Sequence, residues 1–321
     1  MNVLLIKLGA LGDFVLAVGM MRAIVEKVRE DHPDARFTLM TGGAFLPIAE
    51  QMGVFSDYII DNRGPYWKPG ELARVMKETA RGGFERIYDV QGSKRTRRKY
   101  FWLLRLLMPR SFVWTHCHYG REVHVSKKRR WSVGRLQTVP SPRLGRRTDL
   151  SFLHGKNEHF ADLPERFVLL IPGCSPKHPY KRWAASRYAE LARRLAMRGL
   201  HSVVIGTGDE KEAIAEIAAA TPFAVNMMNK TSLLDVPDLA LRAVAVVGND
   251  TGPTHMASLA GAPTIALYDD RTRNSVTCGP RSWNMVSEGE IARIAVDEVW
   301  ERLLPLLGGE LQSIAPEAAA P

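Results

Sequence analysis

The sequence is poor in cysteine and contains no long hydrophobic run. Its 321 residues include three cysteines, Cys117, Cys174 and Cys278, which are too few and too widely spaced for a disulfide framework or a paired-thiol metal site. No apolar stretch reaches the roughly 18 residues that a membrane-spanning helix needs. The opening MNVLLIKL is typical of a strand and not of a signal peptide. We therefore expect a folded protein of a reducing, cytoplasmic compartment.

Two common site motifs are also absent. The first strand ends in KLGALGDFVLA, which lacks the third glycine of a dinucleotide-binding fingerprint, and the second strand ends without the acidic residue of that fold. This disfavours an oxidoreductase. The cluster His116, Cys117 and His118 has no second ligand pair at a supporting spacing, and no D-x-D-type acidic pair lies near the candidate sites. We therefore predict no metal site.

Acidic residues are scarce in the first half of the chain. Residues 1–150 hold 27 Lys and Arg against 14 Asp and Glu, whereas residues 151–321 hold 17 against 20. Such asymmetry favours an anionic partner for the first half: nucleic acid, a membrane face, or a substrate rich in phosphate and carboxylate. A basic surface that only confers solubility is the plain alternative. A nucleic-acid-binding module has no recognition motif to support it here.

Short apolar segments alternate with amphipathic ones through most of the chain. Strands are predicted at residues 2–8, 36–40, 57–60, 86–90, 111–115, 167–173, 201–206, 243–250 and 263–268. The alternation, which fails between residues 119 and 165, predicts an α/β fold of two doubly wound, Rossmann-like domains. We place them at residues 1–158 and 159–308, followed by a disordered tail at 309–321. Their ligand is expected in a cleft between them.

Chemistry-bearing side chains follow three of these strands. Asp13 stands where the first strand gives way to a helix, and either caps that helix or serves as a general base facing the cleft. In IPGCSPKHPYKRW, polar and cationic residues lie between a strand and a helix, where a pyrophosphate binds well. A solvated basic loop explains this second segment equally well. Its candidate ligands are Ser175, Lys177, His178, Lys181 and Arg182.

The third segment is GNDTGPTH, residues 248–255. Thr251 and the first N–H groups of a helix starting at Gly252 suit a phosphate. Asp250 would be repelled by that phosphate unless it serves another group, such as sugar hydroxyls. His255 either adds a further donor or is an ordinary core or capping histidine.

The segment GSKRTRRKYFWLLRLL, residues 92–107, joins a cationic cluster to an aromatic and leucine-rich face. It fits an anionic membrane surface, an acidic acceptor, or a core helix with a solvated basic end. The residues alone leave these alternatives open; the resemblance to a known family given below favours Lys94, Arg95, Arg97 and Arg98 as acceptor contacts, with help from SKKRR at residues 126–130.

At these residues the chain resembles glycosyltransferase family nine, the inverting GT-B enzymes typified by ADP-heptose:lipopolysaccharide heptosyltransferases. The resemblance rests on LLIKLGALGDFVLA, PGCSPKHPYKRWAASRYAELARRLAMRGL and VVGNDTGPTHMASLAGAPTIALY, in that order. It implies two facing Rossmann-like domains, the first binding the acceptor and the second the nucleotide-sugar. It further implies a metal-independent enzyme without a cofactor that moves a sugar, most simply heptose from ADP-heptose, onto a lipopolysaccharide core or related glycolipid.

The resemblance also assigns roles to particular residues. Asp13 corresponds to the catalytic base, and Lys181 to the lysine that contacts the donor phosphates. Glu210 takes the place of the acid that binds the ribose, with Asp209 beside it. The residues matching the motif that holds donor sugar and phosphate are Asp250, Thr251, Gly252 and His255.

The chain departs from the family pattern at two places. YDDRTRNSVTCGP replaces a Gly-Pro-Thr-rich segment, and the proline usual in the first helix is missing around Gly19 and Met20. A different nucleotide-sugar, such as an N-acetylhexosamine donor, and a non-catalytic nucleotide-sugar-binding protein remain alternatives. We expect a monomer at the cytoplasmic face of the inner membrane, with an ADP-linked donor, an anionic glycolipid acceptor and no nucleic acid as partner.

Overall fold

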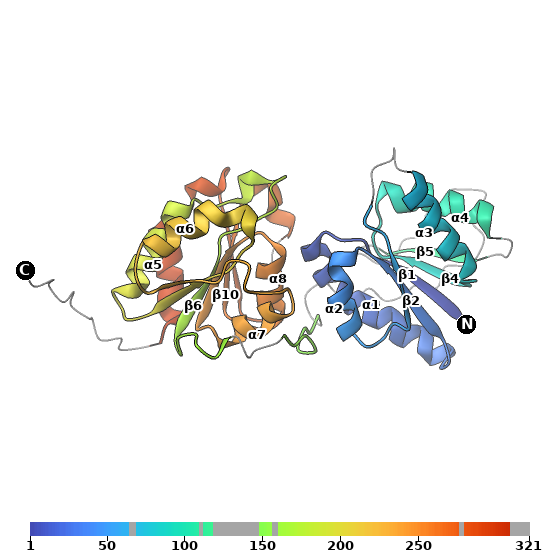
Figure 1. Cartoon of the computed structure of the whole chain (residues 1–321), viewed down its shortest axis with the longest axis horizontal. Coiled ribbons are helices and arrows are strands. Elements are labelled where there is room, and N and C mark those ends of the chain that lie inside the picture. The colour runs from blue at the N-terminus through green and yellow to red at the C-terminus, as the bar shows by residue number, and fades with distance from the viewer. Residues whose placement is uncertain (64–68, 109–111, 118–147, 156–159, 276–278, 309–321) are drawn as a thin grey trace, which may run out of the picture. The chain divides into compact units, whose positions relative to one another are not determined.

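The computed structural model describes residues 1–63, 69–108, 112–117, 148–155, 160–275 and 279–308. The chain divides into two compact units, Met1–Thr148 (unit 1) and Asp149–Pro321 (unit 2) (Figure 1). The domain boundary that the sequence predicts, at residue 158, falls outside the described residues. The tail predicted to be disordered, 309–321, also lies outside them.

Unit 1 is built on a parallel sheet with the strand order β3-β2-β1-β4-β5. The strands are β1 (Asn2–Ile6), β2 (Arg36–Thr41), β3 (Asp57–Ile60), β4 (Arg86–Asp89) and β5 (Val113–His116). The helices are α1 (Leu11–Asp31), the 3-10 helix η1 (Gly43–Phe45), α2 (Leu46–Gln51), α3 (Pro69–Arg81), the π-helix η2 (Arg95–Tyr100) and α4 (Phe101–Leu107).

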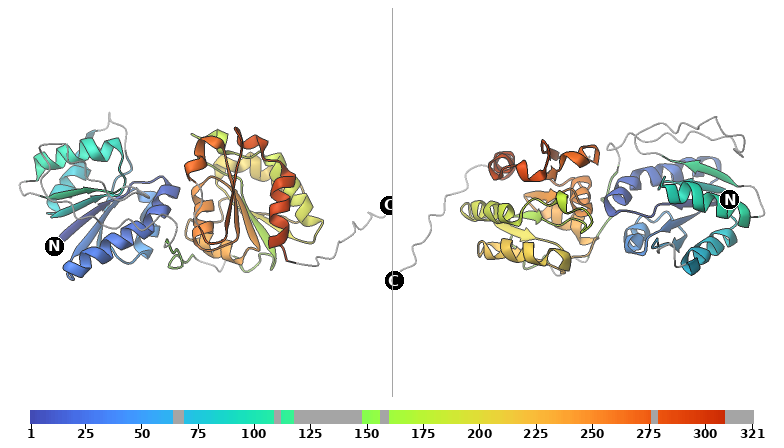
Figure 2. Two further views of the ribbon diagram at one scale, coloured as in Figure 1. Left: turned by 180° about the vertical axis from the view of Figure 1, so that it is seen from behind. Right: turned by 90° about the horizontal axis from the view of Figure 1, so that it is seen from above.

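The core of unit 1 lies on both faces of its central strand. Val3–Ile6 of β1 are fully buried, as expected for a parallel strand covered on both sides. One hydrophobic cluster joins Leu4 and Ile6 to Val75 of α3 and Leu104 of α4. Helices α1 and α2 lie on the other side of the sheet (Figures 1 and 2).

Unit 2 is built on a second parallel sheet, with the order β11-β10-β9-β6-β7-β8. Its strands are β6 (Phe167–Ile171), β7 (His201–Val204), β8 (Ala224–Asn226), β9 (Ala245–Asn249), β10 (Thr264–Tyr268) and β11 (Ser282–Val286). Its helices are α5 (Ala185–Ala196), α6 (Lys211–Ala219), α7 (Asp235–Arg242), α8 (Gly252–Leu259) and α9 (Val296–Leu303). Short 3-10 helices are η4 (Pro179–Lys181), η5 (Gly208–Glu210), η6 (Asp270–Ser275), η7 (Ile291–Arg293) and η8 (Leu304–Leu306).

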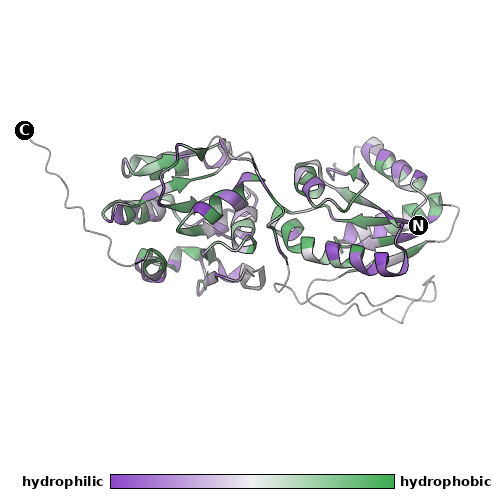
Figure 3. Cartoon of the chain, turned by 90° about the horizontal axis from the view of Figure 1, so that it is seen from below, coloured by the Kyte–Doolittle hydropathy of each residue, from purple (hydrophilic) through white to green (hydrophobic). Residues whose placement is uncertain are grey.

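The core of unit 2 packs α5, α6 and α9 against one face of its sheet. Val168 and Leu170 of β6, Leu191 of α5 and Val299 of α9 belong to one buried cluster. Helix α8 lies on the opposite side from α5 (Figure 1). Figure 3 shows the consequence for both units: the strands are largely hydrophobic, whereas the helices carry hydrophobic and hydrophilic residues in alternation.

Because all strands of each sheet are parallel, their carboxyl ends gather at one edge of that sheet. These edges are where open α/β sheets bind ligands. Within the part of the chain that the structure describes, no helix has the length and apolar character needed to cross a bilayer.

Candidate functional site

The junction between β9 and α8 in unit 2 contains the most specific sequence motif. Asp250 directly follows β9, Thr251 occupies the N-cap position with an extended backbone, and α8 begins at Gly252. The side chain of Thr251 makes no capping hydrogen bond, and the first N–H groups of a helix have no partner inside it. A Cβ added to Gly248 would lie 2.4 Å from the Thr254 hydroxyl, so glycine allows β9 to approach α8 closely.

Asp250 and His255, both buried, form a cluster with the half-buried Lys181. The Lys181 Nζ atom lies 2.8 Å from Asp250 Oδ2, and His255 Nε2 lies 3.2 Å from Asp250 Oδ1. Burial alone would raise the pKa of Asp250, but hydrogen bonds and charge from His255 and Lys181 outweigh it and hold that pKa below its usual value. His255 Nδ1 is buried and has no hydrogen-bond partner among the described residues. The cluster thus places one cation and one unsatisfied ring nitrogen beside the amino end of α8.

Asn249 holds the loop that carries Lys181. Its Nδ2 donates to the carbonyl of Pro172 at 2.6 Å, and its Oδ1 accepts from the Trp183 backbone N–H at 3.2 Å and the Tyr188 hydroxyl at 3.0 Å. The Trp183 indole is buried and donates to a backbone carbonyl at 2.9 Å. A single buried amide at the end of β9 therefore fixes the loop between β6 and α5.

Glu210, the predicted ribose ligand, caps a helix. Its Oε2 accepts from the Thr207 backbone N–H at 2.9 Å and from the Thr207 hydroxyl at 2.8 Å. Its Oε1 lies 3.8 Å from Arg182 Nη2, and that nitrogen also donates to the Cys174 carbonyl at 3.1 Å. Ser175, predicted to bind the donor, is exposed in the same loop. One carboxylate oxygen of Glu210 is thus committed to capping, and the other faces Arg182.

In unit 1, Asp13 is exposed in the first turn of α1. The N-cap residue is Ala10, so Asp13 does not occupy the capping position that the sequence allowed. A carboxylate in the first turn is nonetheless stabilised by the positive end of the helix dipole. Asp13 therefore presents an acidic group at the carboxyl edge of the unit 1 sheet.

Lys7, which directly follows β1, is buried close to Asp13. Only 1% of its surface is exposed. Burial lowers the pKa of Lys7 to about 8; Asp13 and Asp89 oppose this effect, and Arg63 adds to it. Sequence reasoning missed Lys7, although its position after a fully buried strand was a usable signal.

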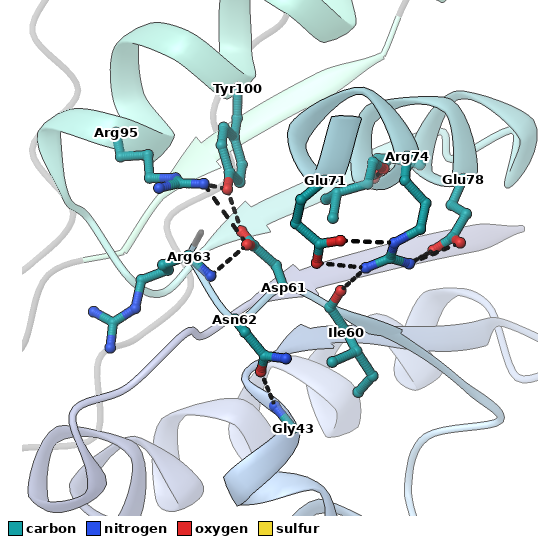
Figure 4. A network of polar contacts seen from close by, with 12 residues as sticks. Gly43, Ile60, Asp61, Asn62, Arg63, Glu71, Arg74, Glu78, Arg95 and Tyr100 are labelled. Carbon is teal, nitrogen blue, oxygen red and sulfur yellow. Dashed lines mark hydrogen bonds and ion pairs between the residues drawn. The ribbon is translucent and has the colours of Figure 1, made fainter. Parts of the chain in front are cut away.

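The predicted acceptor contacts divide into two groups. Lys94 and Arg98 are exposed, and Arg97 is half-buried. Arg95 instead turns inward: its Nε donates to the Tyr100 hydroxyl at 2.8 Å, and its Nη2 lies 3.7 Å from Asp61 Oδ1 (Figure 4).

Asp61 is the centre of this inward-facing network. It is buried, and it accepts hydrogen bonds from the Tyr100 hydroxyl and from the Arg63 backbone N–H. Burial and the Asp61 charge raise the pKa of Tyr100. The network joins the loop after β3 to η2. It explains why the Arg95 side chain turns inward, whereas Lys94 and Arg98 are exposed.

His116 and Cys117, two members of the histidine and cysteine cluster, lie in structural environments. His116 Nδ1 lies 3.1 Å from Asp89 Oδ2, and burial raises the pKa of the Cys117 thiol to about 12. His118 lies outside the described residues, as do residues 126–130. Among the residues that are described, no three His, Cys, Asp or Glu side chains are placed to hold a metal ion.

Comparison with known proteins agrees with the motifs. Residues 139–290 match the family described as glycosyltransferase family 9 (heptosyltransferase). Over 95 residues the chain is 38% identical to lipooligosaccharide heptosyltransferase 2 of Haemophilus influenzae, which covers 28% of this chain and 28% of the relative. It is 36% identical, again over 95 residues, to lipopolysaccharide heptosyltransferase 2 of Escherichia coli, covering 28% and 27%. The alignments therefore span little more than a quarter of these relatives.

The fold is similar over nearly the whole chain. ADP-heptose lipopolysaccharide heptosyltransferase II of E. coli superposes with a TM-score of 0.69 at 21% identity, covering 96% of this chain and 98% of that one. E. coli heptosyltransferase WaaC with ADP-2-deoxy-2-fluoro heptose gives a TM-score of 0.67 at 18% identity, covering 95% and 99%. Residues 139–290 thus resemble glycosyltransferase family 9, and the fold of nearly the whole chain resembles that of the two heptosyltransferases.

Proposed function

We propose that this protein is an inverting glycosyltransferase that moves heptose from ADP-heptose onto the core of a lipopolysaccharide or a related glycolipid. The observation that carries the proposal is the cluster of Lys181, Asp250 and His255 at the amino end of α8. It combines an anion site with a carboxylate suited to sugar hydroxyls. The named relatives and the WaaC complex with an ADP-heptose analogue supply the choice of sugar.

The donor binds along the carboxyl edge of the unit 2 sheet. Lys181 and the first N–H groups of α8 meet the pyrophosphate, because helix amino ends and lysine both favour phosphate oxygens. Thr251 adds its uncommitted hydroxyl. Asp250, kept ionised by its two partners, accepts hydrogen bonds from the sugar. Glu210 Oε1 accepts from the ribose.

Asp13 takes the proton of the acceptor hydroxyl as that oxygen attacks the anomeric carbon. The bond from this carbon to the diphosphate oxygen breaks on the opposite face, so the configuration inverts. Negative charge grows on the departing diphosphate, and Lys181 and the α8 amides are already placed to stabilise it. The cleft that would bring Asp13 to the donor stays a prediction, since Asp13 and Lys181 belong to different units.

Calorimetry with ADP-, UDP- and GDP-linked sugars tests this function, followed by transfer of labelled sugar to a lipopolysaccharide that lacks heptose. We expect tight binding of ADP-heptose and release of ADP with label in the lipid fraction. Binding without transfer would instead support a non-catalytic nucleotide-sugar-binding protein. Preference for another nucleotide-sugar would move the protein to a different reaction within the family.

Peripheral membrane association is the finer part of the proposal. The outer face of α4 exposes Trp102 at 63% and Leu106 at 82%, one helical turn apart and therefore on the same side. Exposed Arg98, Lys99 and Arg105 stand around them. Basic and apolar side chains together on one helix face suit an anionic lipid surface. Binding to vesicles of anionic and neutral lipid tests this part.

A further inference from the structure

Arg271 follows β10 and is held by a buried carboxylate. Asp269 is only 1% exposed. Its Oδ1 accepts from Arg271 Nε at 2.6 Å and its Oδ2 from Arg271 Nη2 at 2.9 Å. Asp269 also accepts from the backbone N–H groups of Arg271 at 3.0 Å and Ile291 at 3.2 Å. Hydrogen bonds from Arg271 lower the pKa of Asp269 to about 2, so this two-pronged pair stays charged near neutral pH.

The flat face of Arg271 lies against Tyr180. The guanidinium carbon is 4.0 Å from the centre of the Tyr180 ring, a distance at which the cation is attracted by the ring. Tyr180 and Lys181 are neighbours in η4. Arg271 therefore stands next to the loop that brings Lys181 to Asp250.

Arg271 retains hydrogen-bonding capacity toward solvent. A guanidinium has five N–H donors, and Nη1 of Arg271 has no acceptor among the described residues, while 56% of the side chain is exposed. Arg74 in unit 1 shows the contrast. All three of its nitrogens are engaged, by Glu71, Glu78 and the Ile60 carbonyl (Figure 4). Arg74 thus uses all three of its nitrogens to hold neighbouring groups in place. Arg271 is fixed in direction by Asp269, but its Nη1 group can still donate hydrogen bonds.

The order of strands places Arg271 at one end of the donor site. Along the edge of the sheet run β7, β6, β9 and β10. Glu210 follows β7, Lys181 follows β6, Asp250 follows β9 and Arg271 follows β10. Neighbouring strands are about 4.8 Å apart, so the row spans roughly 14 Å. A nucleotide-sugar is also linear, with ribose, diphosphate and sugar in sequence.

If the ribose meets Glu210 and the diphosphate meets Lys181, the transferred sugar extends toward β10. We infer that Arg271 is a specificity-determining residue of the donor site, whose free N–H groups bind hydroxyls of the transferred sugar while Asp269 and Tyr180 fix its direction. The inference rests on the proposed function. It adds a preference for a sugar with hydroxyl groups within reach of Arg271 over a deoxy sugar.

The test compares two ligands on one variant. Arg271→Met keeps the side-chain length and removes every donor. Calorimetry should show ADP binding within about twofold of wild type, because the diphosphate site is untouched. ADP-heptose should bind about tenfold or more weakly, as expected on losing hydrogen bonds from a charged donor. Arg193→Met, the same substitution at an exposed position of α5, is the matched control and should leave both affinities unchanged.

Other outcomes would overturn the inference. If Arg271→Met weakened the affinities for ADP and ADP-heptose equally, Arg271 would be a phosphate ligand or a residue that only holds the loop in place. If neither affinity changed, Arg271 would not belong to the donor site. If Arg271→Met does not fold, Arg271→Lys is used instead, because it preserves the charge but not the paired N–H groups of the guanidinium. It should show the same selective loss of affinity for ADP-heptose, but a smaller one. Failure of the wild-type protein to bind any nucleotide-sugar would instead overturn the proposed function, and this inference with it.

Discussion

At the scale of single residues, Asp13 decides whether unit 1 takes part in chemistry. It is exposed in the first turn of α1, three residues after the N-cap residue Ala10. A side chain that only stabilises the helix through its dipole contributes about 0.3–1 kcal/mol. A general base typically contributes a rate factor of 10² to 10⁴. The two roles are therefore easy to distinguish by measurement.

We expect Asp13→Asn to reduce transfer by about 10²-fold or more, because the amide cannot accept the proton of the acceptor hydroxyl. Donor affinity should stay near that of wild type, since the proposed donor contacts lie in unit 2. Turnover of labelled donor and calorimetry with ADP measure the two effects. Asp31→Asn, the same change at the last residue of α1, is the control and should leave both unchanged. Near-normal turnover in Asp13→Asn would remove Asp13 from the role of base.

Lys7 gives a prediction that does not depend on substrate. Its pKa in the folded chain is about 8 against an ordinary value of 10.5. Between these values the unfolded chain binds a proton that the folded chain does not, so stability rises with pH across that window. Below about pH 8 the buried charge destabilises the fold, and this penalty disappears as the pH rises toward 10.5.

Lys7→Met removes this titration. The difference in unfolding free energy between wild type and variant should shift by about 3 kcal/mol in favour of wild type between pH 7 and pH 10.5. Urea unfolding at a series of pH values measures it. Lys77→Met, at an exposed position of α3, should give a difference that does not vary with pH. A flat difference for Lys7→Met as well would show that the amine keeps its ordinary pKa in the folded chain.

The sequence predicted which residues of the proposed donor site lie together better than it predicted what surrounds them. Lys181, Asp250 and His255 were chosen from motifs, and the structure brings them within hydrogen-bonding distance. Asn249 and Arg271 were missed, because each acts through partners far away in the chain. The contacts of Asn249 with Pro172 and Trp183 join residues 77 and 66 positions apart, and no local pattern reveals such pairs.

At the scale of secondary structure, each strand predicted from the sequence has a counterpart, and β8 and β11 were not predicted. Both lie at edges of the unit 2 sheet, and their residues are partly or fully exposed. The signal used to find strands was a continuous apolar run, which marks strands buried on both faces. Edge strands lack it. The π-helix η2 was equally invisible, since its sequence RTRRKY is simply basic.

Helix α4 carries the prediction for membrane binding. Replacing Trp102 and Leu106 together by serine should weaken binding to vesicles with anionic lipid by about tenfold or more, since burying each side chain contributes roughly 1.5–3 kcal/mol. Thermal stability should change little, because both side chains already face solvent. Co-sedimentation with anionic and neutral vesicles measures the binding.

The control for α4 is Leu241→Ser, which changes an exposed leucine of α7 in unit 2. It should bind vesicles as wild type does. Raising the salt concentration should also weaken binding to anionic vesicles, through screening of Arg98, Lys99 and Arg105. If the double variant bound anionic vesicles as wild type does, Trp102 and Leu106 of α4 would not contact lipid.

At the scale of the whole molecule, each unit has its own sheet and its own core. We therefore expect calorimetric unfolding in two steps. The proposed donor contacts belong to unit 2, so ADP should shift one transition and not the other. At a hundredfold excess over its dissociation constant, a ligand stabilises by about 2.7 kcal/mol, or roughly 5–10 °C for a unit of this size.

Scanning calorimetry with and without ADP measures this shift. Lys181→Met should reduce it, because the proposed diphosphate site loses its cation. Equal shifts of both transitions, or a single cooperative transition, would show that the units are energetically coupled in the nucleotide-bound protein.

All residues proposed to contact the donor lie in unit 2, and this has a practical consequence. Lys181, Glu210, Asp250 and Arg271 are all contributed by residues after Thr148, and the family match at residues 139–290 falls almost entirely in the same unit. Under the proposed function, a chimera that joins this segment to the amino-terminal part of a heptosyltransferase of similar fold should therefore keep its nucleotide preference. The grafted unit would then set the acceptor, so the acceptor could be exchanged without redesigning the donor site.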